Sequence, residues 1–284
     1  MPETQKPLIV IDVDAVLKQR VPGLWRWLPR FVIRGVERLI HQDGLNWLLR
    51  SNYPKRGVEF CEGVFDNLKV TTELVNADRL PAAENRRVTY ICNHPLGALD
   101  GMALIAAVGR HHGCEPYFVV NDLLSAVEPL SDVFIPINKH GAQSRQAAER
   151  LEEAFASDRP MIVFPAGMVS RKGKGGVIAD LKWNKMFVGK CLKNSRDVIP
   201  VFFGGKNSQF FYNFARIRTK LGIKFNYEMV LLPSEVFKSQ GKHYKIHIGQ
   251  QIPIEEISNM STSETLEKVR KAVYAMSEDG DNKL

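Results

Sequence analysis

The residues best suited to chemistry lie in one short stretch, positions 93–101, with the sequence Asn-His-Pro-Leu-Gly-Ala-Leu-Asp-Gly. His94 titrates near neutral pH, so it can take a proton from a hydroxyl or an amine, and a carboxylate such as Asp100 can fix its tautomer and stabilise the imidazolium. A structural role is the alternative, because Asp is a favoured helix N-cap and Pro-Leu-Gly is typical of a turn. The spacing alone slightly favours the structural role.

The elements around this stretch place it where α/β proteins bind ligands. It follows a predicted strand, Val88–Cys92, and precedes a predicted helix, Asp100–Arg110, and open α/β sheets carry their sites at the carboxyl ends of strands. Further short apolar runs alternate with amphipathic runs, which indicates an α/β domain. The other predicted strands are Pro116–Val120, Val133–Ile137, Pro160–Phe164, Val198–Phe203, Tyr227–Leu232 and Tyr244–Gln250, and the other predicted helices are Gly141–Ala156 and one opened by a Ser261-x-x-Glu264 capping box and ending near Met276.

The histidine stretch resembles the first motif of the glycerolipid (lysophosphatidate-type) acyltransferase superfamily, in which four residues usually separate His from Asp. Here five residues intervene, from Pro95 to Leu99. The longer form Asn-His-Pro-Leu-Gly-x-Leu-Asp-Gly is similar to the hemolysin-like, aminolipid O-acyltransferase branch, whose members include enzymes of ornithine- and glycine-lipid synthesis. This resemblance reverses the balance in favour of a catalytic pair, His94 and Asp100.

Three further stretches resemble the remaining motifs of that superfamily in the expected order. Residues 134–139 resemble the second motif, with Lys139 where an arginine is more usual; residues 164–171 resemble the third, with Ala166 in place of a common glutamate; and residues 198–205 resemble the fourth. The motifs together cover roughly residues 85 to 210. The resemblance implies that the substrate-binding residues are Asn93, Lys139, Phe164, Pro165, Ala166, Gly167, Ser170 and Arg171.

The resemblance also implies a fold and a reaction. The fold is a mixed central sheet flanked by helices, of the glycerol-3-phosphate acyltransferase type, preceded by amphipathic N-terminal helices. The reaction transfers a fatty acyl group from an acyl thioester of acyl carrier protein or coenzyme A to the hydroxyl of a lyso-aminolipid, an N-(3-hydroxyacyl) amino acid, with no metal and no bound cofactor. A lysophosphatidate or other lysophospholipid acceptor is the near alternative. A non-catalytic, peripheral membrane lipid-binding protein is the alternative of another class.

Composition agrees with anionic partners without choosing among them. Lysine and arginine exceed aspartate and glutamate by eight, and the pI is near 9.3, so the surface attracts lipid headgroups, nucleic acid or phosphorylated cofactors. The four cysteines form no C-x-x-C pair, which argues against a disulfide framework or a zinc site. No signal peptide and no run long enough to span a bilayer is apparent. The resemblance implies a peripheral protein on the cytoplasmic face of the inner membrane.

Residues 1–65 are predicted to form a helical, basic, membrane-associating segment, and residues 66–284 the acyltransferase domain. Arg26, Arg30, Arg34 and Arg38 recur every fourth residue, which predicts a cationic stripe on a helix, although Pro29 marks a helix start or a kink. Such a helix suits the membrane interface, where its arginines meet anionic headgroups. A basic helix packed against the domain is an equally good interpretation.

Two basic segments leave more than one interpretation open. Residues 170–176 combine cations with glycines, so they predict a mobile loop that binds a carboxylate or phosphate, or else an ordinary solvated loop; the spacing does not match a nucleotide-binding P-loop. An aromatic and basic segment suits a nucleic-acid surface, a helix that lines an acyl tunnel or contacts a bilayer, or core packing, and we favour core packing and expect no nucleic-acid partner. It consists of Phe210, Phe211, Tyr212, Phe214, Arg216 and Arg218.

Overall fold

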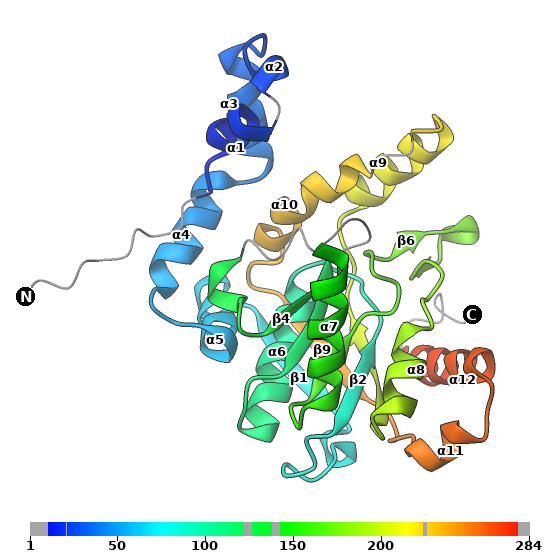
Figure 1. The fold of residues 1–284 in the computed structure, drawn as a ribbon. Helices are drawn as coiled ribbons and strands as arrows, with labels where there is room; N and C mark the ends of the chain where they lie inside the picture. The colour runs from blue at the N-terminus through cyan, green and yellow to red at the C-terminus, as the bar shows by residue number, and fades with distance from the viewer. Residues whose placement is uncertain (1–10, 21, 122–126, 138–142, 224–225, 278–284) are drawn as a thin grey trace, which may run out of the picture.

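A computed structural model describes residues 11–20, 22–121, 127–137, 143–223 and 226–277 (Figure 1). Within these ranges, seven strands form one mixed sheet in the order β1-β9-β8-β2-β5-β3-β4. Most neighbours are parallel, and β9 runs antiparallel to β8. The mixed central sheet expected from the sequence is confirmed. The strands of this sheet are β1 (Thr71–Val75), β2 (Val88–Cys92), β3 (Tyr117–Asn121), β4 (Phe134–Ile137), β5 (Met161–Val163), β8 (Asp197–Gly204) and β9 (His243–Ile248).

Helices cover both faces of the sheet, which explains why its central strands are apolar on both sides. Every residue of β2 is buried, and its successive side chains alternate between two core clusters. Tyr90 packs in the core that contains α5 and α6, whereas Ile91 packs in the core that contains α7, α8 and α12. These helices are α5 (Gly57–Leu68), α6 (Leu99–His112), α7 (Gln143–Ala156), α8 (Met186–Lys193) and α12 (Thr262–Tyr274).

Six of the seven strands predicted from the sequence are confirmed, β2 with both ends as predicted and the other five with ends shifted by one or two residues. The Ser261 capping box opens α12 as expected. The strand predicted at Tyr227–Leu232 is wrong, because this segment forms a 3₁₀ helix, η5 (Tyr227–Leu231), that leads directly into α10 (Leu232–Phe237). Strand β1 was not predicted. Its exposed edge residues Thr71-Thr72-Glu73 lack the apolar pattern of the central strands.

The N-terminal helices project from the body of the molecule, as Figure 1 shows. Arg30, Arg34 and Arg38 are exposed on α3, but Arg26 lies in the turn before it, because Pro29 occupies the N-cap position; the predicted stripe therefore has three arginines on one helix. The projecting helices are α1 (Val13–Arg20), α2 (Pro22–Trp25), α3 (Arg30–Leu39) and α4 (Gln42–Asn52).

Helix α5 belongs to the main body. It runs from Gly57 to Leu68, so it continues across the end of the predicted N-terminal segment at residue 65. Its apolar side chains belong to the core shared with α6. A short hairpin of β6 (Arg171–Lys172) and β7 (Ile178–Ala179) precedes α8, and α9 (Gln209–Lys220) follows β8. In the described ranges, no helix is both long and apolar enough to cross a membrane. The remaining short elements are η1 (Ala77–Arg79), η3 (Glu128–Leu130), η4 (Lys174–Gly176) and α11 (Ile254–Ser258).

Candidate active site

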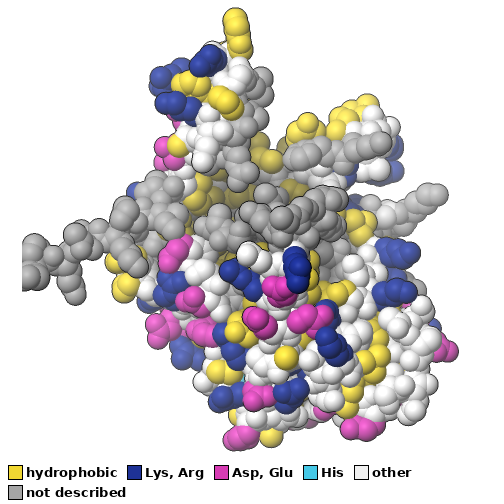
Figure 2. All heavy atoms as spheres, viewed as in Figure 1, with side chains coloured by type: hydrophobic (Ala, Val, Ile, Leu, Met, Phe, Trp, Pro, Cys, Tyr) yellow, Lys and Arg dark blue, Asp and Glu magenta, His cyan; other side chains and the backbone are white. Residues whose placement is uncertain are grey.

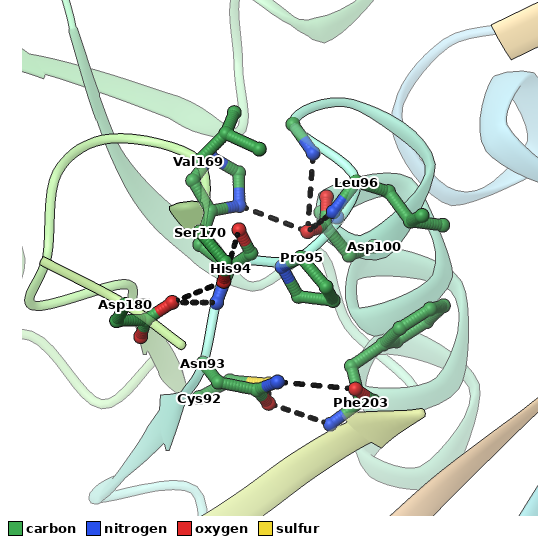
Figure 3. A network of polar contacts seen from close by, with 12 residues as sticks. Cys92, Asn93, His94, Pro95, Leu96, Asp100, Val169, Ser170, Asp180 and Phe203 are labelled. Atoms are coloured by element: carbon green, nitrogen blue, oxygen red, sulfur yellow. Dashed lines mark hydrogen bonds and ion pairs between the residues drawn. The ribbon is translucent and has the colours of Figure 1, made fainter. Parts of the chain in front are cut away.

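His94 and Asp100 meet at the carboxyl end of β2 (Figure 3). His94 Nδ1 lies 2.9 Å from Asp100 Oδ2. The carboxyl group is fully buried, whereas 14% of the imidazole is exposed. Since Nδ1–H donates to the carboxylate, the other ring nitrogen, Nε2, is an acceptor, and it has no hydrogen-bond partner among the described residues. The geometry is that of a histidine general base with its orienting carboxylate.

The same carboxylate also fixes the backbone around it. Asp100 Oδ2 accepts hydrogen bonds from the amides of Leu96, at 2.9 Å, and Gly97, at 3.2 Å, and Oδ1 accepts one from Gly101 at 2.9 Å. Burial opposes ionisation of Asp100, but the His94 charge and these hydrogen bonds outweigh it and hold the pKa of Asp100 below its usual range. The expected N-cap role of Asp100 is wrong, because Ala98 is the N-cap of α6 and Asp100 lies in its first turn. Its carboxylate instead holds the preceding turn and pairs with His94.

The pKa of His94 lies above its usual value. Burial alone lowers the pKa of the imidazole, but the charge of Asp100 and its hydrogen bond to Nδ1 raise it by more. The ring also stacks on Phe164, with centroids 4.4 Å apart and planes 30° from parallel, and Phe164 in turn contacts the edge of Phe118 at 5.1 Å. Packing and charge together therefore fix the plane of the His94 ring.

Glycine is the residue type that fits position 97, in the turn between His94 and α6. Its φ is +89°, a backbone conformation that favours glycine. A Cβ atom there would lie 2.6 Å from Val169 Cγ2 and 2.9 Å from Leu232 Cδ1. The turn therefore packs directly against the third motif on one side and α10 on the other.

Asp180, which the sequence analysis did not identify, holds the backbone of His94 from the other side (Figure 3). Its Oδ1 accepts hydrogen bonds from the His94 amide, at 3.1 Å, and from Ser170 Oγ, at 2.6 Å, while Oδ2 accepts one from Trp183 Nε1 at 2.8 Å. Burial raises the pKa of Asp180, against the effect of these donors. The Ser170 amide donates to the His94 carbonyl at 2.7 Å, so both peptide groups of the histidine are held.

Asn93 joins the catalytic loop to β8. Its side-chain Oδ1 accepts a hydrogen bond from the amide of Phe203 at 2.7 Å, and its Nδ2 donates to the carbonyl of the same residue at 3.1 Å (Figure 3). Both polar atoms of the side chain are thus used by the backbone of a neighbouring strand. This contact ties the residue before His94 to β8, and the substrate-binding role of Asn93 stays a prediction.

Arg171 is not the cation of a mobile loop. Its guanidinium lies 2.8 Å from the buried carboxylate of Glu228, which also pairs with Arg218 at 2.7 Å. Burial, the largest influence, lowers the pKa of Arg171. The network joins β6, α9 and η5, so Arg171 ties these elements together instead of projecting into solvent.

Of the other predicted residues in the third motif, Phe164 alone has a ring contact with His94 among the described residues. The carbonyl of Pro165 accepts a hydrogen bond from the Asn184 amide at 2.8 Å, and the amide of Gly167, whose φ is +61°, donates to the Phe164 carbonyl at 2.9 Å. Ala166 is half-buried between them. Lys139 lies outside the described residues. In the part of the chain that the structure describes, no three His, Cys, Asp or Glu side chains are grouped to hold a metal ion.

A buried histidine–carboxylate pair lies at a strand end of a mixed α/β sheet, where such folds carry their sites, and it has the geometry that general-base catalysis requires. The family model described as Acyltransferase matches residues 15–282. The chain therefore belongs to this acyltransferase family, and the resemblance to lipid acyltransferases in the sequence is confirmed.

Two relatives match nearly the whole chain. Each is named lyso-glycine lipid O-acyltransferase, one from Bacteroides thetaiotaomicron and one from Phocaeicola vulgatus, and each is 39% identical over 274 residues. The matches cover 96% of this chain and 100% and 97% of the relatives. A solved structure, the 1-acyl-sn-glycerophosphate (LPA) acyltransferase PlsC from Thermotoga maritima, aligns over 86% of this chain and 89% of its own, with a TM-score of 0.44 and 16% identity.

Proposed function

We propose that the protein transfers a fatty acyl group from an acyl thioester to the hydroxyl of a lyso-aminolipid, an N-(3-hydroxyacyl) amino acid. The observation that carries the proposal is the buried His94–Asp100 pair with its free Nε2 within the described residues. The relatives named lyso-glycine lipid O-acyltransferase support the acceptor class, and glycine is the amino acid to test first.

In the proposed reaction, His94 Nε2 takes the proton of the acceptor hydroxyl as its oxygen attacks the thioester carbonyl. The carbonyl oxygen carries the negative charge of the tetrahedral intermediate, which backbone amides or a nearby cation stabilise. The carbon–sulfur bond then breaks, and the thiolate takes the proton from the imidazolium. Asp100 stabilises the imidazolium throughout, and the products are an ester and a free thiol.

The donor and the place of the reaction complete the proposal. The donor is an acyl group on acyl carrier protein or coenzyme A, both anionic, which the net charge of +8 favours. No bound cofactor takes part. Within the predicted N-terminal segment, residues 1–65, the projecting helices meet the membrane interface through the cationic face of α3, while α5 stays packed in the main body. The acyltransferase domain then works as a peripheral protein on the cytoplasmic face of the inner membrane.

Transfer of a labelled acyl group tests this function. The full chain is incubated with labelled acyl-carrier-protein or acyl-coenzyme-A thioesters and a panel of lyso-glycine lipid, other lyso-aminolipids and lysophosphatidate. We compare the native protein with His94→Ala and with His243→Ala, a matched control whose imidazole is exposed at the start of β9. We expect the native protein and the control to esterify a lyso-aminolipid, and His94→Ala to lose activity by about 10³-fold.

Three results contradict the proposal at different points. Activity retained by His94→Ala overturns the general-base mechanism. Preference for lysophosphatidate overturns the acceptor. No transfer to any acceptor by a folded native protein that still binds lipid vesicles favours the non-catalytic lipid-binding alternative.

A further inference from the structure

Helix α9 carries a continuous apolar stripe on its outer face. Phe210 and Ile217 are each 58% exposed, Phe214 is 38% exposed, and Leu221, the residue after the helix, is 69% exposed. Their spacing of four, three and four residues places all four side chains on one face of a helix. Isolated exposed apolar residues are common on proteins, but four in one row mark an interaction site.

The inner face of α9 is firmly attached to the catalytic centre. Phe211 and Tyr212 are fully buried in a cluster with Val169 of the third motif. Tyr212 Oη accepts a hydrogen bond from the Asn207 amide at 3.1 Å, and Asn207 Nδ2 donates to the carbonyl of Pro95, the residue after His94, at 3.1 Å. The outer stripe is therefore not a core face that has failed to pack.

The inner attachment includes charged groups. Arg218 of α9 and Arg171 of β6 share the buried carboxylate of Glu228, so the helix is fixed in rotation as well as in position. Whatever the outer stripe contacts is held at a fixed place relative to His94.

The charges beside the stripe favour an anionic partner. Arg216 and Lys220 are exposed, and at 100° per residue they lie along one edge of the stripe. The helix contains no aspartate or glutamate. A two-fold contact between copies through this face would bring these cations together, whereas anionic lipid headgroups would neutralise them.

The position of α9 suits the same partner. Figure 1 shows that α3 and α9 project toward the same end of the molecule, and Figure 2 shows apolar side chains on both projections with lysine and arginine side chains beside them. On the N-terminal projection, Trp27 is 86% exposed and Phe31 is 76% exposed. One flat lipid surface can therefore meet both projections.

We propose that α9 is a second membrane-contacting helix, which inserts Phe210, Phe214, Ile217 and Leu221 into an anionic lipid surface and holds the catalytic loop at that surface. This inference rests on the proposed function, in that it names the surface from which the lipid acceptor enters. It assigns α9 a contact separate from that of the N-terminal helices.

Vesicle binding by matched variants tests the proposal. The stripe variant carries Phe214→Gln, Ile217→Gln and Leu221→Gln, the charge variant carries Arg216→Gln and Lys220→Gln, and the control carries Arg145→Gln and Glu149→Gln, an exposed pair on α7. Partitioning is measured by co-sedimentation with vesicles containing phosphatidylglycerol and with neutral phosphatidylcholine vesicles. Unfolding midpoints and acyl transfer to acceptor in detergent micelles show that each variant is folded.

We expect the stripe variant to bind both vesicles roughly 100-fold more weakly than the native protein. We expect the charge variant to lose affinity for the anionic vesicles alone, by roughly tenfold, and the control to bind as the native protein does. Micellar activity of the stripe variant should stay near the native value.

Native vesicle binding by the folded stripe variant overturns the proposal. So does a native dimer, seen by light scattering, that the stripe variant converts to monomers, because the stripe is then an interface between copies. Failure of the proposed function can be told apart from failure of this proposal. If the proposed function is wrong, the native protein transfers no acyl group in micelles, whereas vesicle binding by the variants still tests the role of α9.

Discussion

At the scale of single residues, Asp100 uses one carboxylate for two tasks. It raises the pKa of His94 through Oδ2. It also accepts hydrogen bonds from three backbone amides, two in the loop after His94 and one at the start of α6. An asparagine at this position has the same shape and can still accept some of the backbone hydrogen bonds. It lacks the negative charge that raises the pKa of His94. The two tasks can therefore be separated by experiment.

Asp100→Asn should reduce kcat and displace the pH profile. His94 is a base only when neutral, so kcat/KM of the native protein falls as the pH drops through the raised pKa of His94, above about 6.5. Without the carboxylate charge, burial is the dominant influence and lowers that pKa, so the acidic limb moves to lower pH. We expect a loss in kcat of about 10³-fold or more, measured in kcat/KM profiles from pH 5 to 9. An unmoved limb contradicts the pairing.

Gly97→Ala should destabilise the protein and distort the site. The Cβ meets Val169 and Leu232 at a φ of +89°, so we expect unfolding to become easier by about 1–3 kcal/mol. Gly189→Ala in α8 is the matched control, because its Cβ meets nothing within 4 Å, and it should stabilise by about 0.5–1 kcal/mol. Denaturant unfolding measures both, and equal stabilities would contradict the close packing of the turn.

The sequence predicted that His94 and Asp100 form a pair, but it did not predict all of the residues that hold the pair in place. His94 and Asp100 are six positions apart in one motif, so local pattern was enough to find them. Asp180 is 86 positions from His94 and accepts a hydrogen bond from its backbone amide. Every residue type but proline has such an amide, so the sequence contains no pattern that predicts this contact. Glu228 was missed for a similar reason, since its partners Arg171 and Arg218 are brought to it only by the fold.

At the scale of elements, the network around Glu228 joins β6, α9 and η5. Glu228→Gln removes the only carboxylate that this network contains among the described residues, and leaves two partly buried guanidinium groups without a counter-charge. We expect a loss of about 3–5 kcal/mol in the free energy of unfolding, measured by denaturant titration. Glu149→Gln, which removes an exposed partner of Arg145, should change stability by less than about 0.5 kcal/mol. Similar losses in both variants would contradict the buried network.

Elements were predictable where burial shows in the chain, and not where tertiary contacts decide. Strand β2 is apolar on both faces and was predicted to the residue. The segment Tyr227–Leu231 has strand-forming residues, but Glu228 pairs with two arginines and Pro233 lies in the first turn of α10. The segment therefore forms a 3₁₀ helix. Strand β1 is an edge strand whose pairing with β9 depends on residues 172 positions away. The antiparallel direction of β9 is likewise set by the connections, not by its own residues.

At the scale of the whole molecule, the cationic face of α3 should act with the projecting apolar side chains. A variant with Arg30→Gln, Arg34→Gln and Arg38→Gln should bind phosphatidylglycerol-containing vesicles about 100-fold more weakly at low salt, because each arginine near an anionic surface contributes about 1 kcal/mol. Arg145→Gln, Arg150→Gln and Lys185→Gln together remove the same charge elsewhere and should bind nearly as the native protein does. Equal losses in the two variants would show that net charge, not α3, drives binding.

The contact between Asn93 and Phe203 has a consequence during synthesis of the chain. The catalytic loop leaves the ribosome 110 positions before the strand that anchors it, so at 5–20 residues per second it waits for about 5–20 seconds. The amphipathic helices emerge earlier still. The loop of His94 therefore lacks its anchor on β8 until most of the polypeptide has been made.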